Sequence, residues 1–166
     1  MQYTLRKSDN RDPNGLLYDS LEPVIRGIGM SLIELSVSRR KGRGESPGSV
    51  RITAVVLHEG NTGVDDCSRA HRAVLPRLEL AFPGQDLYLE VSSPGIDRLI
   101  RDGSEFVHYI GRGVKCYRTD ISAWTAGILC AVDEKKIMIR GEDGEIAVPY
   151  EVIAKARLGS DAKELK

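Results

Sequence analysis

The spacing of hydrophobic and polar residues changes several times along the chain, and each spacing predicts a different element. Apolar residues recur at helical intervals soon after residue 14, and a pair of glycines is expected to end that helix. Its apolar stripe comprises Leu17, Leu21, Val24, Ile25 and Ile28. Apolar and polar residues then alternate over 31–38, with Ile33 and Leu35 on the same face, and again over 50–57. Both segments are therefore predicted to be strands.

The segment between these strands is rich in glycine and basic residues, so 39–49 is predicted to be the tip of a long antiparallel hairpin. A second helix is expected to begin at Asp65 or Asp66, because carboxylates are favourable at a helix N-terminus. Its inner stripe comprises Cys67, Ala70, His71, Val74, Leu75 and Leu78. Pro76 lies within this pattern and is expected to kink or shorten the helix. A turn at 81–84 then leads to a third strand.

The third strand, 87–92, alternates strictly between two faces and ends abruptly. Pro94 lacks the N–H that a strand ladder needs, and it favours an extended conformation for Ser93. Pro94 and Gly95 fit the two central positions of a type II turn, in which glycine takes the positive φ. The first part of the chain is therefore predicted to be an α+β domain, a three-stranded sheet with two helices on one face.

Asp97 and Arg98 follow this turn directly. Asp97 is placed to cap a helical turn, and the guanidinium of Arg98 is free to pair with a carboxylate such as that of Glu90. Such a constrained exit favours a fixed junction between two packed units. An ordinary strand-to-loop exit is the alternative, because Pro and Gly end many strands.

Beyond residue 98 the pattern changes to short strands separated by tight turns. The expected strands are 114–118, 124–132, 136–140, 146–148 and 154–158. Hairpin turns are expected at 133–135 and 142–145, and a single helical turn at 149–152. A succession of short strands at this spacing favours a small closed β-barrel of SH3-like or Sm-like type, which leaves no exposed sheet edge.

A length of 166 residues permits one domain or two small ones, so these patterns decide the division. We predict a flexible N-terminus (1–14), an α+β N-terminal domain (15–97), a β-barrel C-terminal domain (98–160) and a flexible tail (161–166).

One segment of ten residues is far more specific than any of these patterns. The bacterial ribosome maturation factor P family, RimP, has a characteristic segment that resembles Leu89–Arg98, which reads LEVSSPGIDR. The resemblance extends to Val64–Ser68, Tyr109–Gly111 and Ala156–Leu158, and it covers the chain from about Leu16 to Leu158. The chain therefore resembles this family over almost its whole length.

There are two departures from the family pattern. Its members usually carry proline after the Asp-Arg pair, where this chain has Leu99, and an acidic residue at the end of the second strand, where it reads Val56-Leu57-His58. The resemblance implies a non-enzymatic assembly factor that binds the immature small ribosomal subunit transiently and contacts its rRNA and a ribosomal protein. We predict that the junction between the domains serves partner binding, through Glu90, Ser92, Ser93, Pro94, Gly95, Asp97 and Arg98.

Charge is balanced throughout, with 24 basic and 24 acidic side chains in the chain. The segment through Arg98 holds thirteen of each, and the remainder eleven of each. This balance excludes a protein held on RNA by counterion release alone, so any RNA contact must be local or shared with a protein partner. The best local candidate for rRNA binding is the group Arg39, Arg40, Lys41 and Arg43 in the hairpin tip, although a solvated surface loop has the same composition.

No catalytic residue, cofactor or metal site is predicted. No G-x-S-x-G elbow surrounds Ser92 or Ser93, and the sequence lacks the phosphate-loop, H-E-x-x-H and C-x-x-C patterns. Cys67 and His71 lie one helical turn apart, but on the apolar face, so packing is favoured over metal binding. No apolar run reaches membrane-spanning length and no segment resembles a signal peptide, so we expect a cytoplasmic protein, a monomer that does not bind membranes.

The aromatic residues of the second domain allow two interpretations. Phe106, Tyr117, Trp124 and Tyr150 form either a peptide- or protein-binding face or part of the core. Two other classes of function also stay open. One is an SH3-like or Sm-like RNA- or protein-binding module in RNA metabolism or translation control. The other is an RNA-modifying enzyme, for which the sequence offers no recognisable site.

Overall fold

A computed structural model describes residues 1, 15–42, 47–59 and 62–159. These residues belong to two compact units. The N-terminal unit ends at Pro94, and the C-terminal unit comprises the chain from Gly95 onwards together with Met1. The break therefore precedes the boundary expected after Asp97. The ends predicted to be flexible lie outside the described residues, apart from the first residue of the chain.

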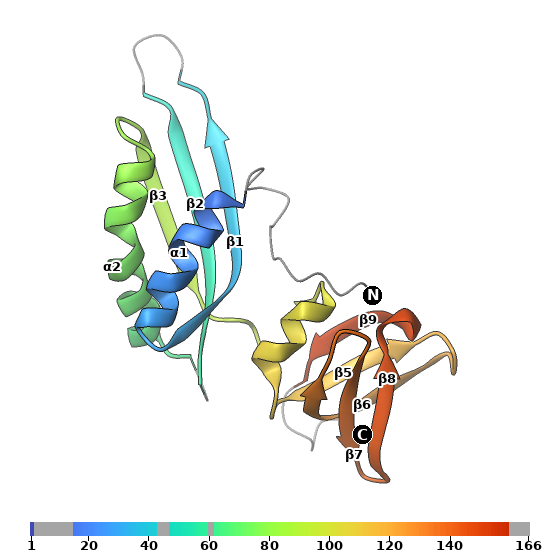
Figure 1. Cartoon of the computed structure of the whole chain (residues 1–166). Coiled ribbons are helices and arrows are strands. Elements are labelled where there is room, and N and C mark those ends of the chain that lie inside the picture. The colour runs from blue at the N-terminus through green and yellow to red at the C-terminus, as the bar shows by residue number, and fades with distance from the viewer. Residues whose placement is uncertain (2–14, 43–46, 60–61, 160–166) are drawn as a thin grey trace. The chain divides into compact units, whose positions relative to one another are not determined.

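In the described part of the N-terminal unit, two helices lie over one face of a three-stranded sheet (Figure 1). The elements are α1 (Leu16–Gly27), β1 (Met30–Arg40), β2 (Ser49–His58), α2 (Val64–Ala81) and β3 (Asp86–Ser92). The sheet has the order β1-β2-β3, with β1 antiparallel and β3 parallel to the central strand. A parallel pair needs a crossover connection, and α2 supplies it. The α+β class and the predicted order of helices and strands are thus observed.

Alternation along the strands sorts the side chains of this unit onto two faces. The residues of β2 that face the helices are at most 2% exposed, and they are Val50, Ile52, Ala54 and Val56. They pack against Leu21 and Ile25 of α1 and against Ala70, Val74 and Leu78 of α2. A β-bulge between Leu32 and Glu34 shifts the alternation of β1. Leu32 and Leu35 consequently both join this core and Ile33 does not, contrary to the expected grouping of Ile33 with Leu35.

The second helix, α2, is longer than the sequence pattern suggested. α2 continues past Pro76 to Ala81, so of the two effects expected of the proline, a kink or a shortened helix, the shortening is wrong. Pro76 lies on the exposed side of the helix, where water can satisfy the carbonyl that the proline leaves unpaired. Among the helices of the described residues, none is long and apolar enough to cross a membrane.

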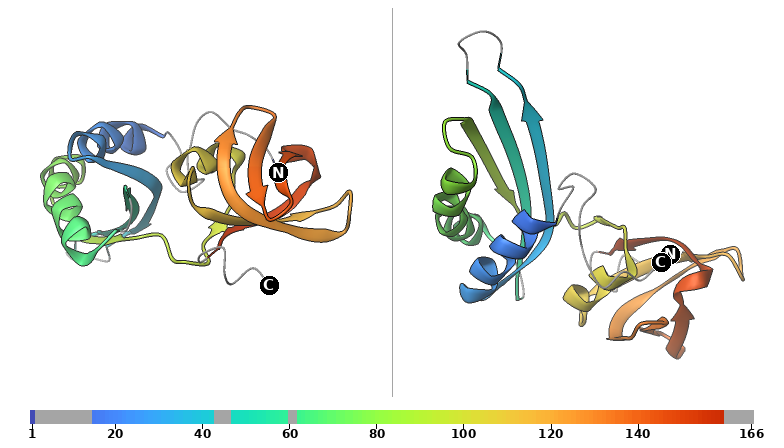
Figure 2. Two further views of the ribbon diagram at one scale, coloured as in Figure 1. Left: turned by 90° about the horizontal axis from the view of Figure 1, so that it is seen from below. Right: turned by 45° about the horizontal axis from the view of Figure 1, so that its top comes forward.

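The C-terminal unit is built, in its described residues, on a strongly curved six-stranded sheet (Figure 2). Its elements are β4 (Leu99–Ile100), η1 (Gly103–Tyr109), β5 (Gly113–Arg118), β6 (Ala123–Val132), β7 (Lys136–Gly141), β8 (Gly144–Pro149), η2 (Tyr150–Val152) and β9 (Ile153–Leu158). The strand order is β4-β9-β5-β6-β7-β8, and all neighbours are antiparallel.

This sheet differs from the predicted barrel in two respects. β4 and β8 are its end strands and no ladder joins them in the described part of the chain, so a closed SH3-like or Sm-like barrel is not confirmed. The strand β4 and the 3₁₀-helix η1 were also not predicted. A strand of two residues is too short to show a period, and η1 lacks the regular spacing of an α-helix.

The core of the C-terminal unit mixes aliphatic, aromatic and ionisable side chains. Its fully buried residues include Phe106, Tyr109, Val114, Cys116, Leu129, Ile137, Ile139 and Val148. The Phe106 and Tyr150 rings lie 6.1 Å apart between centroids, and both side chains belong to the core. Trp124, by contrast, is 49% exposed and meets the Tyr117 ring edge to face at 5.6 Å. Only the second pair is therefore available as an aromatic surface.

Candidate functional site

The junction between the units has a different turn from the one expected. The backbone N–H of Arg98 donates to the carbonyl of Gly95 at 3.1 Å, so the hydrogen-bonded turn spans Gly95–Arg98. Gly95 does not adopt a positive φ. The predicted type II turn with Pro94 and Gly95 at its centre is therefore wrong, because that turn requires a positive φ at the glycine.

Asp97 holds this turn against the sheet of the C-terminal unit. Its carboxylate lies 3.1 Å from Nζ of Lys115 on β5 and 2.7 Å from Nη1 of Arg157 on β9. The hydrogen bond from Lys115 and the charge of Arg157 lower the pKa of the Asp97 carboxyl. Asp97 does not cap a helical turn as predicted. The residue that caps η1 is Asp102, whose side chain accepts from the backbone N–H of Ser104 at 2.8 Å.

Arg98 is built into the same unit. Its side chain is 13% exposed, and its Nη2 lies 3.5 Å from Oε2 of Glu105, whose side chain is 6% exposed. The carboxylate beside Arg98 is thus that of Glu105, where Glu90 had been expected. The carbonyl of Arg98 also accepts from the backbone N–H of Leu158 at 2.9 Å, next to the pairing of β4 with β9. Arg98 and Asp97 are therefore both anchored to the C-terminal sheet.

The earlier junction residues belong to the N-terminal unit. Glu90 and Ser92 lie on β3, in register with Thr53 and Val55 of β2. Ser93, Pro94 and Gly95 carry no regular secondary structure, and Ser93 and Gly95 are exposed. The predicted junction residues consequently belong to two sheets. Glu90 and Ser92 lie in the N-terminal sheet, Asp97 and Arg98 are bonded to the C-terminal sheet, and residues 93–95 connect them.

The basic hairpin is divided too, by the alternation of β1. Arg39 is opposite Val50 and faces the helices, with its guanidinium carbon 5.1 Å from the centroid of the Phe82 ring. Arg40 is opposite Ser49 and points to the face that no helix covers. Lys41 is exposed, and Arg43 lies outside the described residues. Arg39 and Arg40 are adjacent in sequence but lie on opposite faces of the sheet.

Two residues that the sequence analysis did not single out join Arg40 on the uncovered face of the sheet. Arg51 of β2 is exposed and lies in register with Tyr88 of β3, which is 58% exposed. The signal for both was available in the alternation, because Arg51 lies between the buried Val50 and Ile52. This uncovered sheet face is therefore both basic and aromatic at the hairpin end.

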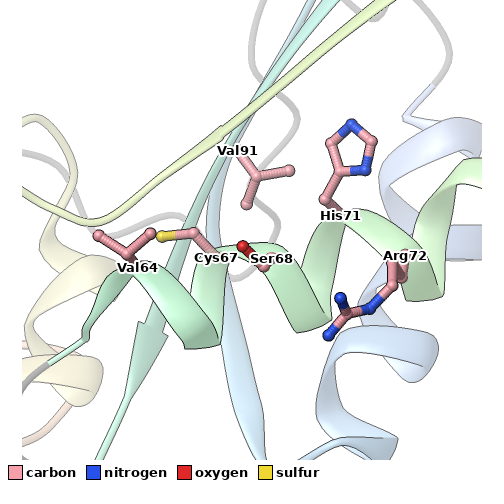
Figure 3. Close-up of a pocket in the computed structure, with 6 residues that line it drawn as sticks. All are labelled: Val64, Cys67, Ser68, His71, Arg72 and Val91. Atoms are coloured by element: carbon pink, nitrogen blue, oxygen red, sulfur yellow. The ribbon is translucent and has the colours of Figure 1, made fainter.

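A groove of about 410 Å³ lies along α2 beside β3 (Figure 3). It is lined by Val64, Cys67, Ser68, His71, Arg72 and Val91. Burial, followed by the nearby charge of Asp66, raises the pKa of the Cys67 thiol, which keeps the thiol protonated and weakens it as a ligand or nucleophile. Neither here nor at any other place in the described residues is a group of three or more His, Cys, Asp or Glu side chains arranged to hold a metal ion.

A family model identifies the N-terminal unit. Residues 20–97 match the RimP N-terminal domain. The match begins within α1, includes all three strands and α2, and ends at Asp97 in the junction. It therefore contains the basic hairpin, the uncovered sheet face and most of the segment on which the sequence resemblance depends. The N-terminal unit is therefore a RimP N-terminal domain, and this match supports the assignment of the chain to the RimP family of ribosome maturation factors.

Proposed function

We propose that this protein binds the immature small ribosomal subunit, assists its assembly and then dissociates. The observation that carries the proposal is the match of residues 20–97 to the RimP N-terminal domain. The family consists of non-enzymatic assembly factors, so the proposed role is binding without a catalysed reaction, a cofactor or a metal ion. We expect the protein to act as a monomer in the cytoplasm.

The N-terminal unit is proposed to contact small-subunit rRNA through the hairpin residues Arg39, Arg40, Lys41 and Arg43. Exposed guanidinium groups suit phosphate oxygens, because their planar fork donates two parallel hydrogen bonds. The whole chain is neutral, so only a few such contacts contribute to binding. A small number of phosphate contacts favours an interaction that is specific and reversible, as a factor that must leave requires.

The C-terminal unit is proposed to contact a small-subunit ribosomal protein. Trp124 and Ile121 are 49% and 52% exposed, and Tyr117 packs against the Trp124 ring. Aromatic residues are enriched in protein interfaces, where they give a large contact area at a low cost in conformational entropy. We propose that this aromatic surface, on an SH3-like sheet, is the protein-binding face.

The junction is proposed to limit how far the two binding surfaces can separate when both engage one particle. Glu90 and Ser92 are secured in β3, whereas Asp97 and Arg98 are secured in the C-terminal sheet. A connection as short as 93–95 has little reach. Two modules joined in this way bind one target with a high effective concentration, provided that its two sites lie close together.

Sedimentation of cell extract at low salt tests the proposal. Wild-type protein is expected in the small-subunit fractions, and reversal of Arg40 and Lys41 to glutamate is expected to reduce that fraction and flatten its salt dependence. The matched control reverses Lys135 and Lys136, an exposed basic pair on the C-terminal unit. Equal losses in the two variants would show that net charge, and not the hairpin, controls the association.

The alternative function is an SH3-like or Sm-like binding module in RNA metabolism or translation control. It is favoured by the curved antiparallel sheet and the exposed Trp124. Absence of the wild-type protein from small-subunit fractions at low salt would support this alternative and contradict the proposed function.

A further inference from the structure

An exposed tyrosine lies on the edge strand β3, on the sheet face that no helix covers. Tyr88 is 58% exposed although its neighbours along β3, Leu87 and Leu89, pack against the N-terminal core. A tyrosine on a strand usually gains stability by covering apolar neighbours. The cross-strand neighbour of Tyr88 is the charged Arg51, so the packing of this unit does not account for the ring.

Two arginines lie on the same sheet face as this ring. Arg51 of β2 pairs with Ser38 of β1 and with Tyr88 of β3. Two residues nearer the hairpin, Ser49 of β2 pairs with Arg40 of β1 and with Asp86 of β3. Both arginines lie on the β2 side of the tyrosine: Arg51 is beside it, and Arg40 is one strand further away and about 7 Å nearer the hairpin. Among the described residues, neither arginine forms an ion pair.

Carboxylates border this surface without neutralising its centre. Asp86 and Glu90 both lie on β3, two residues before and two residues after Tyr88. Asp86 pairs with Ser49, the partner of Arg40, and Glu90 pairs with Thr53. Neither carboxylate forms an ion pair within the described part of the chain. The surface thus has an exposed aromatic ring, two guanidinium groups that form no ion pair in the described part of the chain, and a carboxylate on β3 at each side of the ring.

We infer that this face is a binding site for single-stranded RNA, in which one base stacks on Tyr88 while Arg51 and Arg40 contact the adjoining phosphates. The inference rests on the proposed function and names the form of RNA that the N-terminal unit takes. An aromatic ring beside arginine is the arrangement on which unpaired bases stack, and it tolerates any base because each has a π face. Asp86 and Glu90 restrict the site to a short strand, because they repel phosphates on either side of it.

Duplex RNA and an acidic protein fit this surface less well. A duplex keeps its bases paired, so Tyr88 would have no exposed base to stack on, and a long basic track would be needed instead. An acidic protein would pair with Arg40 and Arg51 but would be repelled by Asp86 and Glu90. Both are retained as outcomes of the experiment.

The experiment measures the affinity of the full chain for a fluorescently labelled oligouridylate by anisotropy. Tyr88→Ala is expected to weaken binding roughly 5- to 100-fold, the range found when one stacked base is lost. Tyr88→Phe keeps the ring and is expected to bind like wild type. Leu80→Ala removes an exposed apolar side chain from α2 of the same unit and is the matched control, with no expected effect.

A salt series separates the arginines from the ring. Arg51→Gln is expected to lower the affinity and to reduce the slope of log affinity against log salt by about 0.7, the value for one phosphate contact on a single strand. Tyr88→Ala is expected to leave that slope unchanged. If Tyr88→Ala binds the oligonucleotide as tightly as Leu80→Ala does, the stacking site is overturned.

Three further outcomes have distinct meanings. Preference for a duplex of the same length, or binding of poly-glutamate in place of RNA, overturns the inference. If the wild-type protein does not bind the oligonucleotide yet sediments with small-subunit particles, the stacking site is overturned and the proposed function stands. Oligonucleotide binding that depends on Tyr88, without particle association, supports the stacking site and contradicts the proposed function.

Discussion

The two units differ in what fills their cores. The N-terminal core is almost entirely aliphatic and is closed by two helices on one face of its sheet. The C-terminal core includes the ionisable side chains of Tyr109 and Cys116, both fully buried, and the nearly buried Arg98–Glu105 pair. One unit therefore depends on packing alone, while the other also depends on the protonation and pairing of buried polar groups.

This difference makes the units separable by experiment. Trp124 is the only tryptophan of the chain, and it lies in the C-terminal unit, so its fluorescence reports on that unit. The described α-helices, α1 and α2, lie in the N-terminal unit, so helical circular dichroism reports on the other. A substitution in one unit can therefore be followed by both signals, so that its effect on each unit is measured separately.

The largest effect is expected from a cavity in the N-terminal core. Leu78→Ala removes a fully buried side chain from α2 and is expected to lower the free energy of unfolding of this unit by about 2–5 kcal/mol. The midpoint of the helical signal in urea should fall while the midpoint of Trp124 fluorescence stays constant. Leu80→Ala, on the same helix but 82% exposed, is the control. Equal shifts of both signals would mean that the units unfold together.

Alkaline pH is expected to act on the C-terminal unit. Burial raises the pKa of Cys116 from 9.0 to about 12 and that of Tyr109 from 10.0 to about 12. Because these folded-state pKa values lie above the unfolded ones, the unfolded chain loses its protons first. Stability is then complete below about pH 9 and falls between pH 9 and 12, by about 1.4 kcal/mol per pH unit for each group past its unfolded pKa.

Urea unfolding at several pH values measures this effect through Trp124. Cys116→Ala with Tyr109→Phe should flatten the pH dependence of the C-terminal unit, although the smaller side chain at 116 lowers its stability at neutral pH. An equally steep alkaline loss in this double variant would contradict the assignment to these two groups.

A smaller effect is expected at the buried ion pair. Arg98→Met leaves the carboxylate of Glu105 nearly buried without its cation, which should destabilise the C-terminal unit by about 1–3 kcal/mol. Adding Glu105→Gln removes the buried charge and should restore part of the loss. A single variant as stable as wild type would show that the pair contributes little, and the junction would then owe its order to Asp97.

The smallest effect is expected at Asp97, which is exposed. Lys115 and Arg157 lower the pKa of this carboxyl, so its contribution is present above its unfolded pKa and is lost as pH falls through the folded value. Asp97→Asn should therefore shift the unfolding midpoint of the C-terminal unit slightly at pH 7 and not at pH 2. A shift of equal size at both pH values would rule out the ion pairs as its cause.

The sequence by itself determined the order of elements in the N-terminal unit and the family. Hydrophobic periodicity is a local property, so helices and strands with one buried face can be predicted from it. It also located the hairpin, the end of β3 and the segment Leu89–Arg98. The same alternation places Arg51 and Tyr88 on the face away from the helices. The predicted RNA-binding group was instead chosen from charges that are close in sequence, such as Arg39 and Lys41.

Only the tertiary structure decided which unit each junction residue serves. Asp97 meets Lys115 and Arg157, and Arg98 meets Glu105, through strand pairings that bring distant segments together. The bulge beside Ile33, the short strand β4 and the open ends of the C-terminal sheet likewise depend on which strands pair. Periodicity shows which face of an element is apolar, but partners, register and sheet closure are set by contacts between residues far apart in the chain, and no local pattern specifies them.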